Sequence, residues 1–207
     1  MRQNLQQNMN LVLQKIFSKL YSPTHTAGNL SGASSIPGTQ RLRDNIIELF
    51  ERHNISSIFD AGCNDCNWMK IVGQFVQYQG GDISLAMVAD AWQRHPELDI
   101  VLHDVTTDPV PNVDLLFVRD VAIHLNNHDR RQLWLNWYRS NVPWILITHQ
   151  THIGQNTDIE YSAEHFPFSA VNWQLPPWNF PVPVDQATDI DANNMSLWHR
   201  DQFKEIL

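Results

Sequence analysis

Short segments of strand length alternate along the middle of the chain with longer segments whose apolar residues recur every three or four positions. The strand-like segments are SSIFDAG, YQGGDIS, LDIVLHDV, VDLLFVRDV and VPWILITHQ. VDLLFVRDV is almost continuously apolar, as expected for a strand that is covered on both faces. Alternation of this kind predicts an α/β fold with a mostly parallel sheet, right-handed crossovers and helices on both faces.

Helices are predicted at residues 39–53, 67–78, 84–95 and 128–140, between these strands. Thr39 is the predicted N-cap of the first helix. The expected buried faces are Leu42, Ile46, Ile47, Leu49 and Phe50 in the first helix, Trp68, Ile71, Val72, Phe75 and Val76 in the second, and Leu85, Val88, Ala89 and Trp92 in the third.

The two ends of the chain have weaker patterns, and we expect one domain over residues 1–207. Residues 1–38 contain a Gly/Ser-rich connector after a predicted short helix, which either packs on the core or forms a substrate lid. Residues 39–150 form the predicted cofactor-binding core. Residues 151–207 are expected to supply substrate-side loops and an antiparallel edge that includes MSLWHR. The apolar face of the predicted N-terminal helix within residues 1–38 is Met9, Leu13, Ile16, Phe17 and Leu20.

Composition narrows the classes of protein to consider. The formal net charge is -8, which argues against nucleic-acid binding through clustered cations. No apolar stretch approaches the roughly 20 residues that span a bilayer. The two cysteines, Cys63 and Cys66, are too few for a disulfide framework. We therefore expect a cytoplasmic protein with a small-molecule partner and no membrane or nucleic-acid partner.

Charged residues follow four successive predicted strands: Asp60, Asp82, Asp104 and the pair Arg119–Asp120. The carboxyl ends of parallel strands meet at one edge of a sheet, where ligands bind in open α/β folds. Asp82 lies 20 residues after Gly62, a spacing typical of an acid that holds a ribose diol. The alternative is that each aspartate only caps the helix after it.

Six motifs in order resemble class I S-adenosylmethionine-dependent methyltransferases, and more narrowly a bacterial small-molecule or polysaccharide-pathway subgroup. They are SGASSIPGT, DAGCNDCNWM, YQGGDI, DLLFVRDVAIHL, LPPWNFPVP and SLW. The resemblance implies a Rossmann-like methyltransferase fold, with a seven-stranded, mostly parallel sheet, an antiparallel C-terminal edge and S-adenosyl-L-methionine as cofactor.

Cofactor-binding roles follow from this resemblance. It implies that Asp60 and Gly62 shape the methionine pocket and that Asp82 holds the ribose hydroxyls. Arg119 belongs to the same predicted site, unless it only forms an ion pair with Asp120. The resemblance further implies that Asp104 and Val105 meet the adenine and that Trp68 and Ile83 form apolar walls.

The turn after the first strand departs from the glycine-rich pattern of the family. Asn64 and Cys66 stand where later glycines are expected. Asn64 tolerates a left-handed backbone and so preserves the turn. Cys66 is compatible only if its side chain points away from the cofactor. A rival interpretation takes the C-x-x-C spacing of Cys63 and Cys66 as a thioredoxin-like dithiol.

Candidate acceptor-side residues lie after the fourth and fifth strands. Asp120 and His124 are four residues apart and share one face if the segment is helical, and we expect His124 to act as general base. Alternatively, His124 only packs or caps there. His149, His152 and Trp178 are predicted to line the acceptor pocket, although edge packing explains Trp178 equally well. No metal is expected.

The sequence therefore predicts methyl transfer from S-adenosylmethionine to a small acceptor, at oxygen more than at nitrogen. A sugar or a surface-polysaccharide precursor is the expected acceptor, because similar proteins are associated with such pathways. The alternatives are a catalytically silent Rossmann-like module that binds a nucleotide or partner protein, and the dithiol oxidoreductase.

Overall fold

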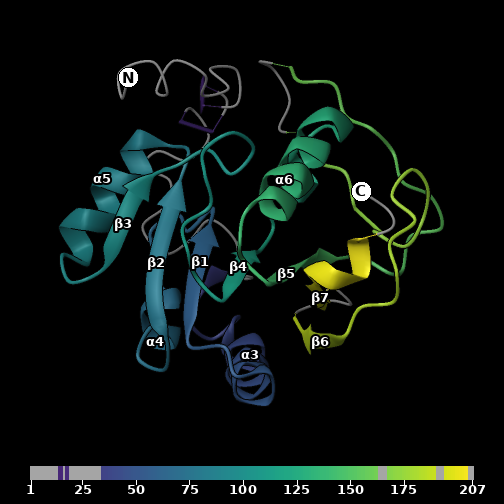
Figure 1. Cartoon of the computed structure of the whole chain (residues 1–207). Helices are drawn as coiled ribbons and strands as arrows, with labels where there is room; N and C mark the ends of the chain where they lie inside the picture. The colour runs from purple at the N-terminus through teal and green to yellow at the C-terminus, as the bar shows by residue number, and fades with distance from the viewer. Residues whose placement is uncertain (1–13, 16, 19–33, 163–166, 190–193, 205–207) are drawn as a thin grey trace.

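The computed structural model describes residues 14–15, 17–18, 34–162, 167–189 and 194–204 (Figure 1). Most of the predicted N-terminal helix, including Met9, Leu13, Ile16 and Leu20, lies outside these residues, so its role as a lid stays a prediction. In the described parts of the chain, no helix combines the length and apolarity needed to cross a bilayer.

A seven-stranded sheet organises the molecule, in the order β3-β2-β1-β4-β5-β7-β6. β1 to β5 are parallel, whereas β7 is antiparallel to both of its neighbours, β5 and β6. The parallel sheet and its antiparallel C-terminal edge confirm the predicted fold class. The strands are β1 (Ser57–Ala61), β2 (Gln77–Asp82), β3 (Asp99–Leu102), β4 (Leu115–Val118), β5 (Trp144–His149), β6 (Asp185–Thr188) and β7 (Asn194–His199).

Helices cover both faces of this sheet. The α-helices are α3 (Gln40–His53), α4 (Met69–Val72), α5 (Leu85–Arg94) and α6 (Asn127–Arg139). The structure also contains the 3₁₀ helices η4 (Ala122–His124) and η5 (Arg200–Phe203). In Figure 1, α6 and η5 lie in front of the sheet near β4, β5 and β7.

Neighbouring side chains on each strand enter different hydrophobic cores, because successive residues of a strand point to opposite faces. Ile58 packs with α3, α4 and α5, and the next residue, Phe59, packs in the core that contains α6. Along β4, Leu115 and Phe117 belong to the first core, whereas Leu116 and Val118 belong to the second. The continuous apolar run of β4 is thus explained by burial on both sides.

The helix predicted over residues 67–78 is mostly wrong. α4 ends before Gly73, and Gln77 already pairs with Ser57 of β1. Phe75, expected to be buried, is 60% exposed. The last residues of the segment fit a helical apolar pattern, but they form strand β2 instead, because they pair with β1.

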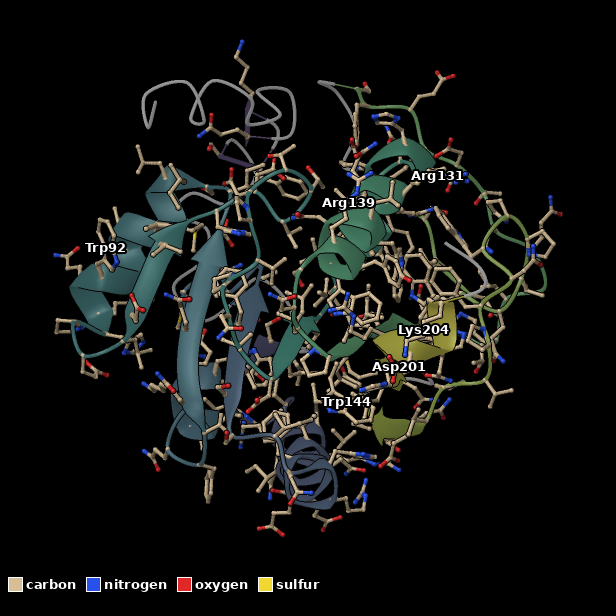
Figure 2. All side chains as sticks on the ribbon, viewed as in Figure 1. Trp92, Arg131, Arg139, Trp144, Asp201 and Lys204 are labelled. Carbon is tan, nitrogen blue, oxygen red and sulfur yellow. The ribbon has the colours of Figure 1, made fainter. Side chains whose placement is uncertain are left out.

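The predicted buried face of α5 is also wrong in part. Met87, Val88 and Ala91 are buried, whereas Leu85 is 56% exposed. Trp92 is half exposed, and its indole Nε1 donates a 2.7 Å hydrogen bond to the carbonyl of Ile100, at the β3 edge of the sheet (Figure 2).

Helix α3 begins where predicted, directly after Thr39, but not through the predicted cap. The Thr39 hydroxyl donates to the Ser35 carbonyl at 2.9 Å, and no side-chain cap bond forms with the helix. Its expected face is buried at Leu42, Ile46, Leu49 and Phe50.

Candidate functional site

A sharp turn joins β1 to α4 at the carboxyl edge of the sheet. Gly62 has a φ of 84°, and a Cβ there would overlap the side chain of Val121, so only glycine fits. Asn64 and Cys66 also adopt left-handed backbones, with φ of 52° and 54°. The prediction that Asn64 preserves the turn is therefore confirmed. The Cys66 side chain is buried within the core on the α3 side, away from solvent.

Asp60 lies near the end of β1 and is 3% exposed. The Tyr78 hydroxyl donates a 2.9 Å hydrogen bond to its Oδ2 atom. Burial raises the pKa of Asp60 to about 7; the hydrogen bond from Tyr78 opposes the rise, Asp82 adds to it, and Arg119 opposes it. Asp60 is thus a carboxyl group whose charge state changes near neutral pH.

Asp82 ends β2 with its carboxylate held from both sides by backbone donors. The Asn64 amide donates to Oδ2 at 3.0 Å, and the Ser84 amide donates to Oδ1 at 2.8 Å. Burial raises the pKa of Asp82, and these two hydrogen bonds partly oppose the rise. Because a carboxylate oxygen has more than one acceptor direction, each oxygen can accept a further hydrogen bond.

The loop after β3 uses Asp104 to stabilise itself. Asp104 is 1% exposed, and its Oδ1 accepts hydrogen bonds from the Thr106 amide and hydroxyl at 2.9 and 2.6 Å. The Val105 carbonyl accepts a 2.9 Å hydrogen bond from Asn136. Ile83, just after β2, is partly buried against the core on the α6 side. The predicted adenine contacts of Asp104 and Val105 stay a prediction.

Arg119 follows β4 and is held on several sides. Its Nε donates to Oδ2 of Asp189 at 2.7 Å, and its Nη1 lies 3.5 Å from Oδ2 of Asp120. Its Cζ lies 5.5 Å from the ring centroid of Trp68. The ion pair with Asp120 anticipated from the sequence is therefore present, but Asp189 is the shorter and more buried partner.

Asp120 has a left-handed backbone, with φ of 55°. Thr148 on β5 holds it there, because its Oγ1 accepts from the Asp120 amide at 2.8 Å and donates to Oδ1 at 3.1 Å. Left-handed non-glycine residues are uncommon and gather at functional sites. The expected shared helical face with His124 is wrong, since only Ala122–His124 form a short 3₁₀ helix.

His124 is buried at the end of η4. Its Nδ1 donates a 2.7 Å hydrogen bond to the Pro167 carbonyl, because a carbonyl oxygen can only accept. In the neutral ring this leaves the lone pair on Nε2. Burial lowers the pKa of His124, and the hydrogen bond to Pro167 and the charge of Asp120 partly oppose the shift.

The three residues predicted to line the acceptor pocket are not brought together. His149 is fully buried, and its ring nitrogens pair with Ser196 and Asn172, each at 2.9 Å. Trp178 is 7% exposed and packs edge-on against Trp173. His152 is exposed on the loop after β5. This geometry favours core packing for His149 and Trp178.

Both cysteines are buried and free. A hydrogen bond with Cys66 and burial raise the pKa of the Cys63 thiol. A reactive dithiol needs an accessible sulfur with a lowered pKa, so the thioredoxin-like interpretation is contradicted. In the described residues, no three His, Cys, Asp or Glu side chains converge as a metal centre requires.

Three residues that contribute to this edge were missed: Tyr78, Thr148 and Asp189. Each contacts a predicted site residue from another strand or from the end of one. Their partners lie 18, 28 and 70 residues away in sequence, so no local motif identifies them.

Comparison with known proteins finds similarity in structure and not in sequence. No protein-family model and no curated protein matches the chain. Magnesium protoporphyrin IX methyltransferase from Synechocystis, solved with S-adenosylmethionine, has a TM-score of 0.61 at 14% identity, covering 92% of this chain and 96% of that one.

Two further methyltransferases have the same fold. Phosphoethanolamine N-methyltransferase 1 from Haemonchus contortus has a TM-score of 0.59 at 11% identity, covering 87% of this chain and 41% of that one. The S-adenosylmethionine-dependent methyltransferase SibL has a TM-score of 0.56 at 13% identity, covering 77% and 54%. Together with the strand order and the antiparallel β7, these structures show that the chain has the class I methyltransferase fold.

Proposed function

We propose that this protein is an S-adenosylmethionine-dependent methyltransferase that methylates an oxygen of a small acceptor. The observation that carries the proposal is the pre-oriented carboxylate of Asp82 beside the left-handed turn at Gly62. Both lie at the carboxyl edge of the sheet, where open α/β folds bind their ligands. The titratable Asp60 lies at the same edge.

The residues at this edge fit such a cofactor. The turn at Gly62 lets the backbone approach a ligand where a Cβ has no room. The two oxygens of Asp82, each already oriented by a backbone amide, suit the two hydroxyls of a ribose. Asp60 offers a negative charge to a cationic ligand once it is ionised. Ile83 directly follows Asp82 in the chain, and Trp68 lies against Arg119, so each can supply apolar surface at this edge.

When bound, S-adenosylmethionine would supply a methyl group on a positively charged sulfur: the acceptor oxygen would bond to the methyl carbon as the sulfur–methyl bond breaks and the sulfur leaves as a neutral thioether. The chain then has to position the acceptor and remove its proton. His124 is suited to this task because its lowered pKa keeps it neutral and its bond to Pro167 leaves the lone pair on Nε2. The charge of Asp120 favours the protonated ring formed afterwards.

A sugar or a surface-polysaccharide precursor is the acceptor that we propose. The resemblance to methyltransferases of such pathways supports this choice. Phe168 adds support, because it is 55% exposed and its ring centroid lies 6.2 Å from that of His124. An exposed aromatic face beside a base suits the apolar face of a sugar ring. Among the predicted acceptor-side residues, His152 is the one that we retain.

Calorimetric titration with S-adenosylmethionine and with its demethylated product tests the cofactor. We expect Asp82→Ala to weaken both ligands by at least about 10- to 100-fold, because even one hydrogen bond to a charged group contributes about 1.5–3 kcal/mol. Asp99→Ala is the matched control. Asp99 starts the neighbouring strand β3, at the opposite end from the site, and its side chain accepts a hydrogen bond from Gln79. Failure of the wild type to bind either ligand at millimolar concentration would refute the proposal.

Turnover against a panel of sugar hydroxyls tests the base. His124→Gln is expected to lower kcat by about 10²- to 10⁴-fold while leaving cofactor affinity unchanged. Equal turnover of the variant and the wild type would exclude His124 as the base. Tight cofactor binding without turnover across the panel would instead favour the catalytically silent module.

A further inference from the structure

Strand β6 has an aspartate at its first residue and another directly after its last. Asp185 lies at the partly exposed end and pairs with Arg52 and His53 of α3, each at 2.9 Å. Asp189 lies at the other end, where its side chain is 4% exposed, and pairs with Arg119. The same residue type thus serves a surface ion pair at one end of β6 and a buried one at the other.

The buried pair has the geometry of a fork. Arg119 donates from Nε to Oδ2 of Asp189 at 2.7 Å and from Nη2 to Oδ1 at 3.3 Å. The guanidinium lies against the ring of Trp68, and its charge acts on Asp60. Trp68 and Asp60 are both residues of the predicted cofactor site, so Arg119 connects that site to the end of β6.

A buried arginine cannot lose its proton to relieve desolvation, so its carboxylate partners decide where the guanidinium lies. Asp120 approaches at 3.5 Å and is more exposed than Asp189. Asp189 supplies the two-point contact, and two points fix the plane of a guanidinium where one leaves it free to turn.

We propose that Asp189 is a positioning residue of the cofactor site, which holds Arg119 over the ring of Trp68 and thereby sets the electrostatic environment of Asp60. Its consequence for cofactor affinity rests on the function proposed above. In the sheet, β5 and β7 separate β4 from β6, so the C-terminal hairpin would contribute to a site otherwise formed by β1, β2 and β4.

The test compares Asp189→Asn with Asp185→Asn, the same substitution at the other end of β6. The first measurement is the pKa of Asp60 in ligand-free protein, by carboxyl ¹³C NMR. Tyr78, Asp82 and Arg119 influence the pKa of Asp60, and the charge of Asp60 in turn raises the pKa of Cys63. Asp189→Asn should raise this pKa, because Arg119, whose charge opposes the rise in the pKa of Asp60, is then no longer held in place. Asp185→Asn should leave it unchanged.

The second measurement is S-adenosylmethionine affinity in a double-mutant cycle. Asp189→Asn should weaken binding by about tenfold through misplacement of Arg119 and Trp68. Adding it to Arg119→Gln should cause no further loss, because Asp189 acts through Arg119. The double variant also removes both buried charges together, so it remains informative if Asp189→Asn alone does not fold.

Two results would overturn the inference. One is an unchanged or lowered pKa of Asp60 in folded Asp189→Asn, or an equal change in Asp185→Asn. The other is a further loss of affinity when Asp189→Asn is added to Arg119→Gln. If the wild type does not bind S-adenosylmethionine, the proposed function fails, and the NMR measurement alone still decides the role of Asp189.

Discussion

The two faces of the sheet bury different kinds of core. The face covered by α3, α4 and α5 is mostly aliphatic, with Leu42, Ile46 and Leu49 at its centre. We call the opposite face aromatic because it contains a cluster of rings around Trp134 of α6, namely Trp137, Trp173, Phe180, Trp198 and Phe203. The first is built mostly by helices and strands, whereas the second also takes Trp173, Trp178 and Phe180 from the irregular segment between β5 and β6.

This difference explains how a long irregular segment keeps a defined structure. Trp173 donates from its indole to the Thr148 carbonyl at 2.9 Å, and Trp198 donates to the Pro181 carbonyl at 2.9 Å. Large rings bury much apolar surface per residue and lose few rotatable bonds, which suits a segment without its own backbone ladder. The aliphatic face does not need such side-chain hydrogen bonds, because the backbone amides and carbonyls of its helices and strands bond to one another.

The largest expected effect comes from removing the centre of the aromatic face. Trp134→Ala should lower the free energy of unfolding by about 3–5 kcal/mol, because a fully buried Trp leaves a large cavity. Urea unfolding measures this loss. Trp134→Phe is the control and should cost less. A loss from Trp134→Ala no greater than that from Trp92→Ala would show that the aromatic rings do not act as a core.

The aliphatic face is expected to carry a pH dependence, through Asp60. Its folded pKa of about 7 exceeds the ordinary value of 3.8, so the folded state holds a proton that the unfolded state releases between these pH values. Stability should therefore fall as pH rises from 4 to 7, by at most about 1.4 kcal/mol per pH unit from this group.

Asp60→Asn should remove that slope, as measured by urea unfolding at several pH values. Asp185→Asn is the contrasting variant, because hydrogen bonds from His53 and Arg52 help to lower the pKa of Asp185. Asp185 contributes stability that is lost as pH falls through its folded pKa, the opposite sign. An unchanged slope in Asp60→Asn would mean that Asp60 is ionised throughout this range.

The same titration predicts how affinity depends on pH. S-adenosylmethionine carries a net positive charge, so ionised Asp60 should favour its binding. Affinity should rise as pH increases through 7 in the wild type and should be flatter in Asp60→Asn. Calorimetry between pH 6 and 8 measures affinity against pH for both proteins. Parallel profiles would show that Asp60 does not contribute to cofactor binding.

The smallest expected effect is at the periphery of the aliphatic face. Trp92→Ala removes a half-exposed ring and one hydrogen bond to Ile100, and should cost about 1 kcal/mol. Urea unfolding again measures it. If Trp92→Ala lowered the free energy of unfolding as much as Trp134→Ala, the stability of the β3 edge would depend on Trp92 far more than its half-exposed position predicts.

Prediction from the sequence succeeded where neighbouring residues alone determine the structure, through a run of apolar residues or through residues that tolerate a left-handed backbone. β4 was identified because both of its faces are buried, and the left-handed turn was identified through Gly62 and Asn64. It failed where pairing overrides periodicity. Residues 77–78 were assigned to a helix and join β2, and β6 was not located because its sequence DQAT carries no apolar alternation.

The candidate site divides in the same way. The sequence alone placed Asp60, Asp82 and Asp104 at strand ends and Arg119–Asp120 after β4, because a parallel sheet brings such ends to one edge. The tertiary structure decided which neighbours determine their charge and orientation. Tyr78 on Asp60, Thr148 on Asp120 and Asp189 on Arg119 all come from distant segments, and the structure likewise placed His149 and Trp178 in the core. The physical reason is that strand order and helix faces follow from short-range patterns of burial, whereas the charge and orientation of a buried polar group depend on whichever atoms the fold packs beside it.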